Sequence, residues 1–70
     1  MSSFIRYILK FKQHNDPYGD VARDILLDEE VNRNWGYRSF VKHLHKRGAC
    51  QRVYEIVDDL WDQYRFFKNI

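Results

Sequence analysis

The sequence contains a single cysteine, a single proline, three glycines and no threonine among its 70 residues. One cysteine cannot close an internal disulfide bond, so the composition excludes a disulfide-stabilised scaffold and favours the reducing conditions of the cytoplasm. Valine and isoleucine are scattered, and no stretch alternates apolar and polar residues for long enough to predict a β-strand. The sequence therefore predicts an all-α protein.

Long apolar segments are lacking as well. No apolar run approaches the roughly 20 residues of a membrane-spanning helix. The first residues do not show the basic and then apolar pattern of a signal peptide. The formal net charge of +2 is too small for the broad basic surface of proteins that bind nucleic acid by charge alone. We expect a cytoplasmic protein that does not associate with membranes.

Aromatic and charged side chains are abundant, at 17% and 31% of the chain. A chain of this length supports one hydrophobic core, so we expect one domain over residues 1–70. Because no disulfide is available, packing of the aromatic rings must supply most of the stability, and each buried ring removes roughly 150–250 Å² from water. Such a small core leaves no room for a buried catalytic cleft, so we expect no enzyme.

Apolar residues recur at three- and four-residue spacing in several segments, which predicts helices. The first helix is expected to follow Ser3 as its N-cap and to run to about Lys12. The second follows Asp16-Pro17, because aspartate caps free backbone N–H groups and proline tolerates the first helical position. After a short helical turn at residues 28–31, a third helix fits Tyr37–Arg47, with Gly48 at its C-terminal end. The last helix is the longest.

The inward positions of these helices define the predicted core. The expected architecture is a compact bundle of four main helices plus the short helical turn. Most of the core is expected to come from Phe4, Tyr7, Phe11, Val21, Ile25, Phe40, Leu44, Val57, Leu60 and Trp61.

Two segments near opposite ends of the chain have a distinctive pattern: the opening aromatic segment 3–12, SFIRYILKFK, and the closing segment 58–64, DDLWDQY, with its Trp-acid-x-Tyr signature. Both resemble the corresponding segments of the bacterial YozE family, whose fold is SAM-like, that is, similar to sterile alpha motif domains. Residues 31–36, VNRNWG, replace the family's Phe-Pro-Lys-like turn. The resemblance implies a SAM-like helical bundle from a bacterium, and it implies no catalytic residue and no cofactor.

Metal-binding and nucleophilic residues are few and poorly spaced. His43 and His45 lie two positions apart on one predicted helix and point to different sides, whereas helical metal ligands need a spacing of three or four. We therefore predict that these histidines and His14 are ordinary surface residues. Cys50 is predicted to be a buried or half-buried thiol near the start of the last helix. No metal site and no Cys–His nucleophile pair is expected.

Charge is distributed unevenly between two predicted helices. Asp20, Asp24 and Asp28 recur every fourth residue and predict an acidic stripe. The helix at Tyr37–Arg47 has no acidic residue, and its basic side contains Arg38, Lys42 and Lys46. Trp35, in the polar turn before this helix, has two interpretations: an exposed binding anchor or a lid over the core.

These surfaces suggest a non-enzymatic protein-interaction module that is able to self-associate. The basic side would meet the acidic stripe of another protein or of a second copy. The alternative is a small nucleic-acid-binding accessory protein that uses the basic helix 38–47 to contact phosphates. The acidic residues of the second and last helices would repel DNA, which favours the protein-interaction hypothesis.

Overall fold

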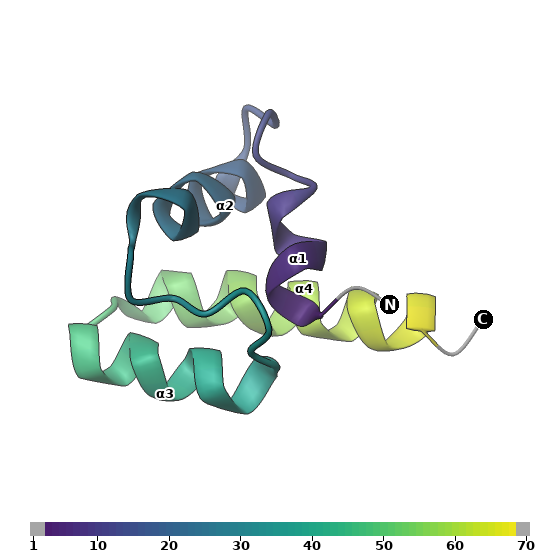
Figure 1. Ribbon diagram of the computed structural model, residues 1–70. Coiled ribbons are helices and arrows are strands. Elements are labelled where there is room, and N and C mark those ends of the chain that lie inside the picture. The colour runs from purple at the N-terminus through teal and green to yellow at the C-terminus, as the bar shows by residue number, and fades with distance from the viewer. Residues whose placement is uncertain (1–2, 69–70) are drawn as a thin grey trace.

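The computed structural model describes residues 3–68, and every regular element in this range is an α-helix (Figure 1). The all-α prediction is confirmed. Residues 1, 2, 69 and 70 of the predicted domain lie outside the described residues. The helices are α1 Phe4–Leu9, α2 Pro17–Leu27, α3 Tyr37–Arg47 and α4 Gln51–Lys68.

Local capping explains where the helices begin and end. The Ser3 hydroxyl accepts a hydrogen bond from the Arg6 N–H at 3.2 Å. The Asp16 carboxylate accepts one from the Gly19 N–H at 3.0 Å, at the start of α2. Gly48 ends α3 with a φ of 72°, a left-handed conformation that glycine adopts without steric cost. These caps confirm the predicted starts of α1 and α2 and the predicted end of α3.

Two predicted elements differ in detail from the structure. Helix α1 ends at Leu9, not at Lys12, because the N–H groups of residues 10–12 donate to carbonyls three residues back and tighten the chain into turns. The predicted short helical turn is a hydrogen-bonded turn, in which the Val31 N–H donates to the Asp28 carbonyl at 3.3 Å.

The short helix α1 is the centre of the fold, since it packs against the other three helices. Figure 1 shows α3 and α4 side by side below α1 and α2. Helix α2 also packs against α4. None of the helices within residues 3–68 is long and apolar enough to span a membrane.

The core confirms much of the prediction and extends it. The predicted residues Phe4, Val21, Ile25, Phe40, Val57 and Leu60 are buried. Tyr7, Phe11, Leu44 and Trp61 are half-buried and pack around them. The core also contains Ile8, Ala22 and Tyr64, which share the apolar helical faces of the predicted residues, and Ile5, which was not predicted. Ile5 was missed because α1 contacts three helices and therefore buries more than one face.

Candidate functional site

Helix α3 exposes a basic side, as predicted. Arg38, Lys42 and Lys46 are all exposed. On the inward side Phe40 is buried, and Tyr37, Val41 and Leu44 pack against the core. The apolar contacts of α3 therefore hold Arg38, Lys42 and Lys46 toward solvent.

Trp35 lies over the core, which agrees with its interpretation as a lid. It is half-buried and packs against the core cluster. Its ring centroid lies 5.4 Å from that of His43. Since part of the indole stays accessible, Trp35 also contributes to the surface of the molecule.

The accessible part of Trp35 forms one wall of a surface depression. Ser39, Lys42, His43 and Lys46 form the rest of its lining. These four residues follow a three- and four-residue spacing, so they belong to one side of α3. The structure thus brings three predicted site residues together, Trp35, Lys42 and Lys46. Arg38 is not part of this lining.

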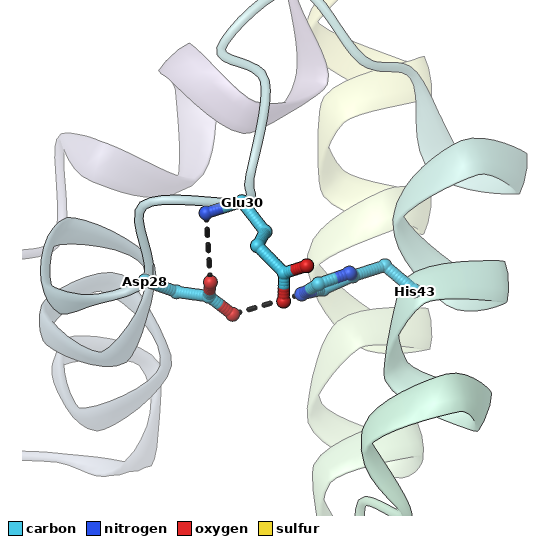
Figure 2. Close-up of side chains that lie close together, drawn as sticks. All are labelled: Asp28, Glu30 and His43. Carbon is cyan, nitrogen blue, oxygen red and sulfur yellow. Dashed lines mark hydrogen bonds and ion pairs between the residues drawn. The ribbon is translucent and has the colours of Figure 1, made fainter.

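His43 is buried, so the prediction of a surface histidine is wrong. It is only 7% exposed, because it lies between Trp35 and the turn that follows α2. Figure 2 shows the ring of His43 directed at the carboxylate of Asp28, with Nε2 2.8 Å from Oδ2. The prediction for Cys50 is also wrong, since its thiol is exposed in the short connection before α4, away from the core.

Asp28 pairs with the buried His43 and does not belong to an exposed acidic stripe. It follows the last residue of α2 with φ −98° and ψ 104°, an extended conformation. The four-residue spacing from Asp24 therefore no longer places it on the same helical face. Asp20 and Asp24 remain exposed on α2, and Asp20 forms an ion pair with Arg23 at 2.7 Å.

The surroundings of Asp28 favour its charged form. The hydrogen bond from His43 is the main reason that the pKa of this carboxyl lies below its usual value, and the Glu30 N–H and Arg47 act in the same direction against the effect of burial. An ionised carboxylate only accepts hydrogen bonds, so Nε2 of His43 is the donor. Asp28 Oδ1 also accepts from the Glu30 N–H at 3.0 Å.

Two basic residues at the end of α3 neutralise the acidic side chains of the turn. Arg47 lies 3.3 Å from Asp28 and 3.6 Å from Glu30. Lys46 lies 3.7 Å from Glu30. The charge of α3 is therefore partly compensated at its C-terminal end, and Arg38 and Lys42 carry no ion pair in the part of the chain that the structure describes.

Asp28, Glu30 and His43 also form a set of potential metal ligands. One ligand atom from each lies within 4.8 Å of the others. Sequence reasoning missed this set because it searched histidines and cysteines, and two of the donors are carboxylates from a turn. The Asp-x-Glu spacing immediately after α2 is the signal that could have directed attention there.

Two acidic residues of α4, Asp58 and Asp59, accept hydrogen bonds from tyrosine hydroxyls. The hydroxyl of Tyr37 donates to Asp58, and that of Tyr18 donates to Asp59. Each bond raises the pKa of the tyrosine, because the neighbouring carboxylate disfavours the phenolate. These carboxylates hold α3 and α2 against α4.

Comparison with known proteins gives one finding about the chain's relationships. The model of the family described as YozE SAM-like fold matches residues 3–65. No curated protein and no solved structure gives a significant match. The family match covers the chain from the cap of α1 into the last turns of α4, so the chain belongs to the YozE family, with its SAM-like fold.

Proposed function

We propose that the protein is a non-enzymatic protein-interaction module that self-associates, with the depression on α3 of one copy binding the acidic face of α2 of another. The observation that carries the proposal is the depression itself, in which the indole of Trp35 lies beside Lys42 and Lys46. An aromatic wall with basic side chains at its edge suits a partner that offers carboxylates.

The balance of charge favours a carboxylate partner over nucleic acid. Lys46 and Arg47 already pair with acidic residues of the same chain. Binding to a phosphate backbone usually depends on many unpaired basic residues, and each contact adds to the salt dependence. Arg38 and Lys42 supply a smaller charge, which matches a short acidic surface.

A second copy of the chain offers such a surface on α2. Asp24 is exposed and has no ion pair within residues 3–68, and Asp20 lies one turn before it. Asp58 and Asp59 are less suitable because each carboxylate already accepts a hydrogen bond from a tyrosine hydroxyl of the same chain. Since the basic and acidic surfaces lie on different helices, the contact would be head to tail, and each copy would retain one unused surface.

Exchange of charges tests the proposal directly. Sedimentation of the wild-type protein should show association that increases with protein concentration and weakens with salt. Lys42→Glu removes the basic surface and Asp24→Lys removes the acidic one, so each variant alone should remain monomeric. An equimolar mixture of the two should form a dimer, because one intact pair of surfaces remains.

Lys12→Glu is the matched control, since Lys12 is exposed but lies in the loop between α1 and α2. It should associate like the wild type. A wild-type protein that stays monomeric, or a mixture that does not dimerise, contradicts self-association. Micromolar binding of duplex DNA that falls steeply with salt and is lost in Lys42→Glu would instead support the nucleic-acid hypothesis.

A further inference from the structure

We propose that Asp28, Glu30 and His43 form a binding site for a divalent transition-metal ion of the Zn²⁺ class. The site joins the turn after α2 to helix α3 (Figure 2). It goes beyond the proposed function and does not depend on it, because the charge pairing between copies is tested at Lys42 and Asp24, which are not metal ligands, although His43 also lines the depression on α3.

The donor set has the chemistry of such a site. One imidazole nitrogen with two carboxylate oxygens is a combination that zinc and its neighbours accept, whereas Mg²⁺ favours oxygen donors and water. Three protein ligands leave the fourth position of a tetrahedral zinc ion for water. One donor atom from each residue already lies within 4.8 Å of the other two.

Two of the three ligands are oriented before any ion binds. His43 is more than nine-tenths buried and its ring packs beside Trp35. Asp28 is fixed by the Glu30 N–H at 3.0 Å. The 2.8 Å between Nε2 of His43 and Oδ2 of Asp28 is slightly less than the ~3–3.5 Å that separates two ligands about 2.1 Å from one ion. A small movement therefore admits the ion at Nε2, and the neutral imidazole then carries its one N–H proton on Nδ1.

The position of Arg47 shows that the two carboxylates converge on a positive charge. Its guanidinium lies 3.3 Å from Asp28 and 3.6 Å from Glu30. The side chain of Arg47 is 53% exposed, so it can turn into water when the ion takes its place. Arg47 therefore acts as the competing cation at the metal-free cluster, and together with Lys46 it balances the charge of the two carboxylates.

Titration of the metal-free protein with Zn²⁺ alone tests the site. Calorimetry should show saturable binding of one ion per chain, and the fluorescence of Trp35 should change because His43 lies beside it. The melting temperature should rise, since the ion binds the folded chain and joins α3 to the turn after α2. Mg²⁺ at the same concentration should produce none of these changes.

Glu30→Gln is the decisive variant, because Glu30 is exposed and its replacement should not impair folding. It should lower the affinity for Zn²⁺ about tenfold or more, since even residues that only support a metal ligand contribute this much. Glu29→Gln is the matched control and should bind like the wild type. The folded His43→Gln variant should not bind the ion.

Three other residues could bind zinc and must be separated from the site. Cys50, His45 and His14 are all exposed, and His14 lies 3.2 Å from the Asp16 carboxylate. Cys50→Ser, His45→Gln and His14→Gln should each retain the wild-type affinity. The proposal is overturned if the wild type shows no saturable binding, if Glu30→Gln binds as tightly as the wild type, or if any of the three surface variants loses the ion.

Discussion

Trp61 of α4 stacks on Tyr37 of α3, with the ring centroids 4.9 Å apart and the ring planes inclined by 27°. The ring of Phe4 from α1 meets Trp61 edge-on at 5.1 Å. Three helices therefore meet at the Trp61 indole. The stacking of Tyr37 on Trp61 therefore attaches the N-terminal end of α3 to α4.

Replacement of Trp61 with alanine should lower the free energy of unfolding by ~3 kcal/mol, the lower end of the range for large aromatic truncations, because the indole is only half-buried. Urea unfolding followed by circular dichroism measures this. Phe66→Ala on the same helix is the control, since Phe66 is 72% exposed and should change the value by about 0.5 kcal/mol or less. Equal midpoints for Trp61→Ala and the wild type would contradict the importance of the ring cluster.

Gly19 occupies a position where a side chain has no space. A Cβ atom there would lie 2.0 Å from the carbonyl oxygen of His14 and 3.0 Å from that of Phe11. Because both atoms belong to the backbone, Gly19→Ala must displace the loop or the first turn of α2. We expect a loss of about 2 kcal/mol or more in unfolding free energy.

Gly36→Ala is the matched control for Gly19. Among residues 3–68, no atom outside its two chain neighbours lies within 4 Å of a Cβ at this position. The same substitution there should cost less than about 1 kcal/mol, the effect of a weaker N-cap for α3. Similar urea midpoints for the two variants would mean that the loop before α2 can move to accommodate the methyl group at little cost in free energy.

The lowered pKa of Asp28 predicts a stability that depends on pH. In the unfolded chain this carboxyl titrates near 3.8, and in the folded protein it titrates lower, so the folded state binds protons less readily. The contribution is fully present above the unfolded value and is lost as the pH falls below about 4 toward the folded value. Asp28→Asn should therefore flatten the decline of urea stability between about pH 5 and pH 2.

Asp24→Asn provides the comparison, because Asp24 is exposed and has no hydrogen bond within residues 3–68. It should follow the wild-type profile. Asp16 has a lowered pKa as well, chiefly from the Gly19 N–H, so a smaller acid decline should persist in Asp28→Asn. A profile unchanged by Asp28→Asn would show that the His43 bond contributes nothing to acid sensitivity.

The fold should not require a divalent metal, even though the cluster at Asp28 is proposed to bind one. In the metal-free protein Arg47 and Lys46 supply the charge that balances the carboxylates. Protein stripped of metal with EDTA should therefore keep the helical circular-dichroism signal of untreated protein and still unfold in one thermal transition. Loss of either would mean that the ion is part of the folded structure.

The sequence by itself determined the features that depend on neighbouring residues. Ser3, Asp16 and Gly48 act as caps because each satisfies or ends a helix within a few residues of its own position. The apolar spacing of α3 likewise determined that Arg38 and Lys42 face solvent while Phe40 faces the core. The same helical spacing predicted that segment 3–12 begins the first helix and that segment 58–64 belongs to the last one.

Only the tertiary structure decided the features that depend on segments distant in the chain. His43 is buried, and Asp28 leaves the acidic stripe, because the turn after α2 passes over α3 and lets the two side chains meet. Cys50 is exposed because the connection between α3 and α4 lies outside the core. Periodicity specifies the direction of a side chain on its own helix, but burial and partnership depend on which other segment packs there.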